Sequence, residues 1–394
     1  SAWLRTRRFW VQLLAGAPVC LMLKSKIIKF FALLFIISAL DYSLSNLFFK
    51  SKSFWKYEKL TDFYWRIPSK EYHHDLLPNI DVIEPWGFSL SKNLITNSIG
   101  FRDFSNREVK KIPSKKRLLL IGDSAIEGAG YDYEHTLGGL LQNNYKGTFE
   151  VLNSAVGSYS PSIYFKKIKF FINEGYKFDE AIIFLDPSDI IDELFIKWDN
   201  NENILINEKD LEKNKITDFL VNNFLIFRTF LRISDGTENL KNYYKLKYKA
   251  SKKFQKSFFE TTVEDTLFYR MTHVDRSAWT FDNKIFENYN KGLADSKKYL
   301  DKLLKLLREN SIGINFVLYP HPSQIYYKDL YHLPYWEKWA KKNKVKMISL
   351  YPDFDGNDKR RIILDTFIFG DLHWNKMGTK IVFESLIKQL KFKN

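Results

Sequence analysis

Short apolar runs alternate with helix-patterned stretches along most of the chain. Runs of strand length that end in turn residues lie at 117–122, 149–153, 180–186, 314–319 and 345–350. Stretches with apolar residues at helical spacing lie at 135–146, 160–175, 292–310, 333–343 and 377–391. Such alternation is typical of a parallel sheet with helices on both faces, so it predicts an α/β domain of three layers.

Two segments depart from this alternation. The connection at 191–290 is rich in Lys, Asn, Tyr and Phe, and it is too long for a structureless loop in a compact domain. We therefore expect a helical insertion or lid there, with one amphipathic helix at 214–233. Residues 54–103 are aromatic and irregular in pattern, which predicts a lead-in that packs on the core.

The N-terminal part is apolar over two runs, at 9–23 and 27–49, which Lys24 and Lys26 separate. The second run has the length of a marginal membrane helix if Lys29 extends toward the interface. Basic residues after Met22 precede it and no small-x-small cleavage site follows, so we predict a retained signal anchor. These charges favour a C-terminal bulk outside the cytoplasm, in the periplasm or at the cell surface. A buried amphipathic helix is the alternative.

Composition narrows the choice of partners. The chain is 45% hydrophobic and 27% charged, which excludes wholesale disorder. A formal charge of +15 would suit an anionic partner, but much of the excess is Lys scattered on helix-like stretches, where a solvated face is the simpler interpretation. No nucleic-acid module accompanies it, so we expect no nucleic-acid partner. The single cysteine, Cys20, excludes an internal disulfide framework and a cysteine-rich metal site.

A serine follows the first strand of the predicted sheet. The apolar run leads directly into Gly122, Asp123 and Ser124. Open parallel sheets place ligands and reactive groups at the carboxyl ends of their strands. Gly122 permits a tight turn, and the amide of Ser124 near a helix N-terminus can donate to a developing oxyanion. A plain strand-to-helix turn capped by Ser124 is the alternative.

A second candidate group lies just before the last predicted helix. A serine hydroxyl needs a base to accept its proton, and the imidazole needs a carboxylate to fix its tautomer and stabilise its cation. Asp371 and His373 can supply both partners from one loop. This Asp-x-His motif before the last helix, together with Gly-Asp-Ser after the first strand, is far more specific than either motif alone.

The pair of motifs resembles the SGNH (GDSL-like) hydrolase and acyltransferase superfamily, whose nucleophile block opens the domain and whose Asp/His block closes it. The run at 153–161 is similar to the second block, in which Gly157 would lend an oxyanion-hole donor. With the segments at 97–103 and 319–325, the blocks look like membrane-anchored members associated with bacterial surface polysaccharides. The resemblance implies a flavodoxin-like, five-stranded parallel sheet.

The third block departs from the superfamily pattern. Where Gly-x-Asn-Asp is usual, this chain has Asp186, Pro187, Ser188 and Asp189, so Ser188 stands in place of the oxyanion-hole Asn. A serine hydroxyl is shorter, and loss of one such donor costs about a hundredfold in rate. Further candidates for binding the substrate are His321, Asp186, Asp189 and Trp374, although His321 is equally well explained as a structural histidine.

His73, His74 and Asp75 suggest metal ligands at first sight. No third set of ligands converges with them, so we expect solvated polar side chains there, and neither a metal nor another cofactor.

The sequence thus predicts a membrane region at 1–53, a lead-in at 54–116 and an SGNH-like domain at 117–394. Ser124 would attack an ester carbonyl, His373 would accept its proton and Asp371 would orient His373. Water would make the chain an esterase, and a sugar hydroxyl would make it an O-acyltransferase. The expected partners are an acylated glycan or small ester, the membrane and, for a transferase, a membrane acyl-donor protein. A non-catalytic glycan-binding or scaffold protein is the alternative.

Overall fold

A computed structural model describes residues 26–49, 65–86, 90–199, 203, 219–220, 223–273, 276–282, 289–327 and 330–392. The chain forms two compact units. The smaller unit comprises Ser1–Lys59 and Glu212–Asn239, and the larger comprises Leu60–Leu211 and Leu240–Asn394.

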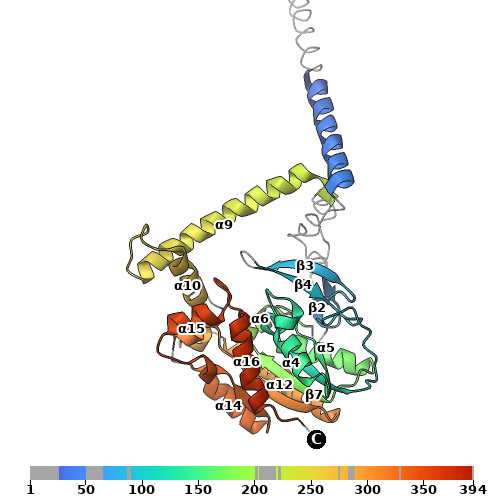
Figure 1. Ribbon diagram of the computed structural model, residues 1–394, viewed down its shortest axis with the longest axis vertical. Helices are drawn as coiled ribbons and strands as arrows, with labels where there is room; N and C mark the ends of the chain where they lie inside the picture. The colour runs from blue at the N-terminus through green and yellow to red at the C-terminus, as the bar shows by residue number, and fades with distance from the viewer. Residues whose placement is uncertain are drawn as a thin grey trace, which may run out of the picture. The chain divides into compact units, whose positions relative to one another are not determined.

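The larger unit is built on a parallel sheet of five strands (Figure 1). They are β5 (Lys116–Ile121), β6 (Phe149–Asn153), β7 (Glu180–Leu185), β8 (Gly313–Leu318) and β9 (Lys346–Ser349). They pair in the order β6-β5-β7-β8-β9, and every neighbouring pair is parallel. This is the flavodoxin-like order that the sequence predicts, and each strand end lies within one residue of its predicted position.

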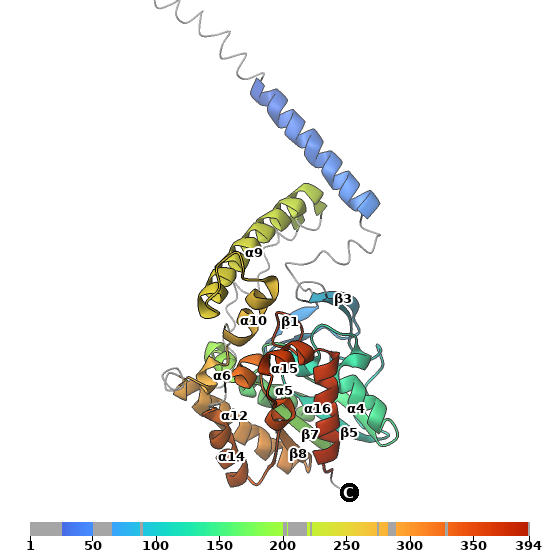
Figure 2. The same cartoon turned by 60° about the vertical axis from the view of Figure 1, so that its left-hand side comes forward.

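Successive side chains of the buried strands face two different cores. Leu119 and Ile121 belong to the core that includes α5 (Pro161–Asn173), α12 (Asn290–Glu309) and α14 (His332–Lys342). Leu118 and Leu120 belong to the core that includes α4 (Leu137–Tyr145), α15 (Lys359–Thr366) and α16 (Lys376–Gln389). Helices therefore cover both faces of the sheet (Figures 1 and 2), which confirms the predicted three-layer sandwich.

The helices form where their apolar residues and caps require them. In α12 the buried positions recur at helical spacing, from Leu293 through Leu300 to Leu307, so one face packs on the sheet. The side chain of Thr136 caps α4 by accepting from the amide of Gly139, and that of Asn375 caps α16.

The lead-in forms two small antiparallel sheets. Strand β1 (Arg66–Ser69) pairs with β2 (His73–Leu76), and β3 (Asp81–Trp86) pairs with β4 (Leu90–Ile95). Leu76 and Leu94 join the core, and the segment forms regular strands although its sequence pattern is irregular. These strands bury charged residues such as Glu84 and Lys92, so they lack the apolar alternation by which strands are recognised.

The described part of the connection at 191–290 is helical. It contains α9 (Leu225–Lys253), α10 (Val263–His273) and a short turn at Ala278–Thr280, after α6 (Asp189–Phe195). The helix expected at 214–233 falls partly outside the described residues, and the described helix continues well beyond it. The remaining short elements are α3 (Ser124–Glu127), α13 (Pro322–Tyr326), Tyr133–His135 and Tyr351–Phe354.

The smaller unit contains an exposed apolar helix at Lys26–Leu47, which ends in a π-helical turn, Ser45–Phe49. Within the described residues it is the helix long and apolar enough to cross a membrane, with a mean hydropathy of 1.9. The first apolar run, at 9–23, lies outside the described residues. The two carboxylate oxygens of Asp41 accept hydrogen bonds from the amides of Leu225 (3.1 Å) and Ile226 (3.2 Å), so Asp41 caps the start of α9.

Candidate active site

The end of β5 presents Ser124 at the carboxyl edge of the sheet. Asp123 is the N-cap of α3, and its carboxylate accepts from the amide of Ala125 at 3.1 Å. Gly128 ends this single turn with a φ of 91°, where a Cβ atom would lie only 2.3 Å from the Thr136 side chain. Ser124 is thereby fixed as the first residue of a one-turn helix, and a larger residue at position 128 would displace it.

A tight loop carries the other two candidate residues. Phe367 and Trp374 form an isolated bridge, and the amide of Ile368 donates to the carbonyl of His373 at 2.8 Å. Gly370 has a φ of 78°, a left-handed conformation that glycine adopts at no steric cost. The loop therefore projects Asp371 and His373 together, just before the start of α16.

The structure brings Ser124, His373 and Asp371 into one hydrogen-bonded chain. The Oγ of Ser124 lies 2.8 Å from Nε2 of His373, and Nδ1 of His373 lies 2.6 Å from Oδ1 of Asp371. The other carboxylate oxygen of Asp371 accepts from the indole Nε1–H of Trp86 at 2.9 Å. The ring of Trp86 also packs edge-on against the His373 ring, with centroids 5.0 Å apart. Trp86 thus orients both His373 and Asp371.

The protonation states of Asp371 and His373 are those that a serine nucleophile requires. Burial alone would raise the pKa of Asp371, but His373 and Trp86 hold it well below its usual value, so Asp371 stays ionised. Burial opposes the charged form of His373, but Asp371 raises the pKa of His373 overall. An ionised Asp371 keeps the proton of neutral His373 on Nδ1 and leaves the lone pair of Nε2 directed at the Ser124 hydroxyl.

A buried ion cluster lies beside Ser124. Arg66 binds the carboxylate of Glu127 through two nitrogens, at 2.8 and 2.9 Å, and Lys92 binds it at 3.1 Å. Although burial would raise the pKa of Glu127, these two cations hold it well below its usual value. Glu127 also accepts from the amide of Gly157 at 2.8 Å. Gly157 lies close to Ser124, but its amide can serve an oxyanion only after releasing Glu127.

A second group of carboxylates lies behind Ser124. Asp123, Asp186 and Asp189 are buried, and each has an oxygen within 4.8 Å of the others. The Tyr319 hydroxyl lies 2.7 Å from Asp186 and 3.1 Å from Asp123, and its single proton serves one of them. Burial and the charge of Asp186 raise the pKa of Asp123 to about 7.

His321 belongs to this group, because its Nε2 lies 2.9 Å from Asp186. Burial would raise the pKa of Asp186, but His321 and Tyr319 lower it, so Asp186 is the charged member of the pair with Asp123. Protein donors therefore contact Asp186, while Oδ1 of Asp189 has no hydrogen-bond partner among the described residues. His321 is buried, with only 4% of its surface exposed.

The remaining predicted residues lie near these groups. Ser188 precedes α6, is buried, and donates its amide to Asp186 at 2.6 Å. Asp189 accepts from the Tyr164 hydroxyl at 2.7 Å. Trp374 is buried and packs against Tyr319, with ring centroids 4.7 Å apart.

The prediction that residues 73–75 are solvated was wrong. Asp75 is buried and forms an ion pair with Lys167 at 2.7 Å, while Nε2 of His74 lies 2.8 Å from the carbonyl of Gly157. Burial lowers the pKa of His74 to about 4, so its ring is neutral and donates through Nε2 to that carbonyl. His74 therefore holds the Gly157 turn in place rather than facing solvent.

Sequence reasoning missed Trp86, Arg66, Lys92 and Glu127. The first three lie in the lead-in hairpins, far along the chain from the motifs they support. Of these four residues, only Glu127 could have been found from the sequence, because it lies on the turn that begins at Ser124 and therefore at the same edge of the sheet.

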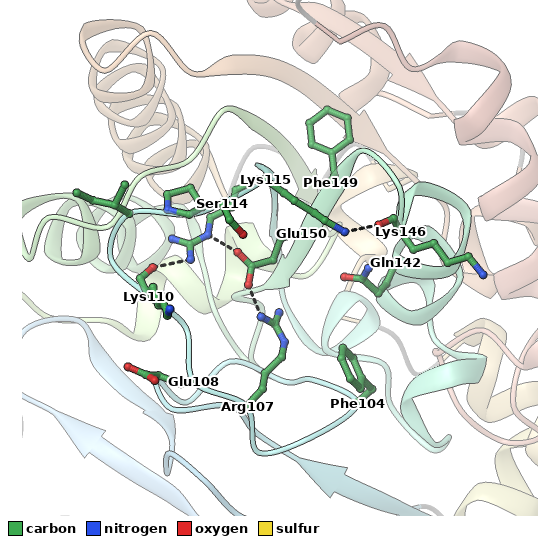
Figure 3. A pocket seen from close by; sticks show the side chains of 13 residues that line it. Phe104, Arg107, Glu108, Lys110, Ser114, Lys115, Gln142, Lys146, Phe149 and Glu150 are labelled. Carbon is green, nitrogen blue, oxygen red and sulfur yellow. Dashed lines mark hydrogen bonds and ion pairs between the residues drawn. The ribbon is translucent and has the colours of Figure 1, made fainter.

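A separate hollow lies at the opposite, amino-terminal edge of β5 and β6. It is lined by basic side chains and measures about 540 Å³ (Figure 3). Several of its charges have partners within the protein: Glu150 binds Arg117 at 2.6 Å and also binds Arg107, and Lys115 donates to the carbonyl of Lys146. No serine-histidine pair is present among its lining residues, so it is distinct from the site at Ser124.

No family model matches the sequence, and no curated protein sequence matches it. Among solved structures, the chain is similar to TesA, with 11% identity and a TM-score of 0.36 over 70% of this chain and 98% of TesA. It is also similar to a GDSL-like lipase from Bacteroides thetaiotaomicron, with 11% identity and a TM-score of 0.35 over 71% of this chain and 90% of the lipase. The esterase EstA from Pseudoalteromonas sp. matches with 11% identity and a TM-score of 0.35 over 70% of this chain and 96% of EstA.

Proposed function

We propose that the chain is a serine ester hydrolase or O-acyltransferase in which Ser124 is the nucleophile. The observation that carries this proposal is the continuous chain from Ser124 Oγ through His373 to Asp371, with distances of 2.8 and 2.6 Å. Two motifs from opposite ends of the domain meet in that chain at hydrogen-bond distance, which is the requirement for activating a serine.

The reaction follows from this arrangement. As Ser124 Oγ attacks an ester carbonyl, its proton passes to Nε2 of His373, and the ionised Asp371 stabilises the imidazolium. The proton then passes from Nε2 to the leaving oxygen, and the carbon–oxygen bond to the alcohol breaks. Water or a second hydroxyl repeats these steps in reverse on the acyl-enzyme and regenerates Ser124.

Three donors are proposed for the oxyanion. They are the amides of Ser124 and Gly157 and, at the position of the missing Asn, Ser188. The bond from Gly157 to Glu127 would open when the oxyanion forms, because Arg66 and Lys92 continue to neutralise Glu127.

The proposed substrate is an acyl group, with acetyl as the first choice, on a bacterial cell-surface glycan. The resemblance of the motifs to polysaccharide-associated SGNH proteins and the apolar helix at Lys26–Leu47 support this choice. The helix would anchor the chain with the catalytic unit outside the cytoplasm. Alkaline phosphatase fused after Lys52 should then be active, and an active cytoplasmic reporter at the same point would contradict this topology.

Ester turnover tests the proposal. The full chain in detergent should hydrolyse a chromogenic acetyl ester, and Ser124→Ala should abolish the turnover. Ser257→Ala, which alters an exposed serine after α9, is the matched control and should behave as wild type. Turnover that persists in Ser124→Ala would refute the nucleophile. Adding a glycan oligosaccharide and weighing the products by mass spectrometry distinguishes transfer from hydrolysis.

The second candidate is a non-catalytic glycan-binding or scaffold protein. The bond between the Gly157 amide and Glu127 favours it, because this bond occupies a donor that catalysis needs. Glycan binding that is equal in wild type and Ser124→Ala, without ester turnover, would identify this alternative.

A further inference from the structure

An apolar cavity of about 580 Å³ lies beside the hydrogen-bonded relay of Ser124, His373 and Asp371. Its wall combines Trp86 and Leu90 from the lead-in, Val263 and Leu267 from α10, and Ile368 and Phe369 from the loop that carries Asp371 and His373. This size and a largely hydrocarbon lining are those of a pocket for a small organic group.

The cavity meets the relay at its histidine end. Trp86 is shared by both: its ring lines the cavity, packs edge-on against His373 and donates to Asp371. Gly157, by contrast, approaches Ser124 itself, since a Cβ atom on Gly157 would lie 3.4 Å from that of Ser124. The apolar lining of the cavity therefore lies on the His373 side of the relay.

The chemistry of the relay decides which part of an ester lies on that side. In the tetrahedral intermediate, the oxyanion faces its donors and the leaving oxygen faces Nε2 of His373, because that nitrogen must deliver the proton. The acyl chain takes the remaining direction. Trp86 contacts His373 and lines the cavity, so a group that extends from the leaving oxygen along His373 would pass Trp86 on its way to the cavity.

We infer that the cavity receives the alcohol part of the ester, and that this alcohol is apolar. The inference rests on the proposed function and deepens its O-acyltransferase form, since it makes the leaving alcohol of the acyl donor a hydrocarbon and leaves the sugar as the acceptor. In a transfer reaction, the apolar alcohol leaves first and takes the proton from His373. The acceptor hydroxyl then attacks the acyl-enzyme, so the acyl donor is a lipid-like ester.

Two isomeric esters test which side the cavity serves. Octyl acetate and ethyl octanoate have the same composition and similar hydrophobicity, but only the first carries its long chain on the alcohol. With the full chain in detergent micelles, we expect kcat/KM for octyl acetate to exceed that for ethyl octanoate by at least about tenfold. The expected gain is about fourfold for each methylene that the cavity removes from water, as far as the chain fits.

Val263→Phe narrows the cavity at a position that is 57% exposed, so the fold should tolerate it. It should reduce the ratio of octyl acetate to ethyl octanoate turnover to near unity. Ile112→Phe introduces the same aromatic side chain at another exposed position, outside the cavity, and should leave the ratio unchanged.

A preference for ethyl octanoate, or equal rates for the two isomers, would overturn the inference and leave the proposed function intact, provided that Ser124→Ala is inactive. A high ratio that survives Val263→Phe would also overturn it. Turnover that persists in Ser124→Ala would overturn the proposed function itself.

Discussion

Replacing Trp86 with phenylalanine tests whether this residue positions the relay. The substitution keeps an aromatic ring beside His373 and removes the Nε1–H that donates to Asp371 at 2.9 Å. Hydrogen bonds to charged groups contribute about 1.5–3 kcal/mol. Asp371 retains 21% side-chain exposure, so water partly replaces the lost donor and the low end of that range applies. We expect kcat/KM to fall about tenfold.

The pH profile separates positioning from a general loss of stability. The bond from Trp86 lowers the pKa of Asp371, and its loss leaves a carboxylate that attracts the imidazolium more strongly. The pKa of His373 should therefore rise further. Because catalysis requires neutral His373, the acidic limb of kcat/KM should move to higher pH, and the variant should lose more activity at pH 7 than at pH 9.

Trp339→Phe is the matched control. Its Nε1–H donates to Asp301 at 2.7 Å between α14 and α12, away from the relay. This variant should lose stability in urea but keep the wild-type pH profile. A Trp86→Phe enzyme with an unshifted acidic limb and undiminished kcat/KM would refute the positioning role.

Three further outcomes are expected. Lys92→Met removes a fully buried cation between Glu84 and Glu127 and should lower the free energy of unfolding in urea by about 3–5 kcal/mol; a loss below about 1 kcal/mol would contradict the cluster. Burial lowers the pKa of His332 to about 3, so the stability that its neutral ring contributes is complete above about pH 6.5 and declines toward pH 3. His332→Gln should therefore make the free energy of unfolding depend less on pH between these two values. Ser188→Asn should raise kcat about tenfold with KM unchanged, and an inert substitution would place the third oxyanion donor elsewhere.

The central sheet could be predicted because its strands are encoded locally. Each is a short apolar run that ends in turn residues, and the helices between the strands carry their own periodicity. The meeting of Ser124 with His373 could be predicted as well, since the residues that follow parallel strands gather at one sheet edge.

The support of the site could not be predicted, because it consists of charges that pair across long stretches of sequence. Glu84 and Lys92 are stable in the interior only beside each other and Glu127, and none of them alone distinguishes a buried position from an exposed one. The lead-in hairpins that bring these charges to the site therefore looked irregular. Trp86 was missed for the same reason, since only the fold brings it to Asp371.

The order of the strands has a consequence for biosynthesis. As the polypeptide emerges, β5 and β6 can pair first, and β7, β8 and β9 then add one after another along the same edge. The serine is therefore made early, while the loop that carries its base joins the finished sheet last. A nascent chain holds Ser124 without a proton acceptor on that loop, so reactivity would begin only once translation has passed His373.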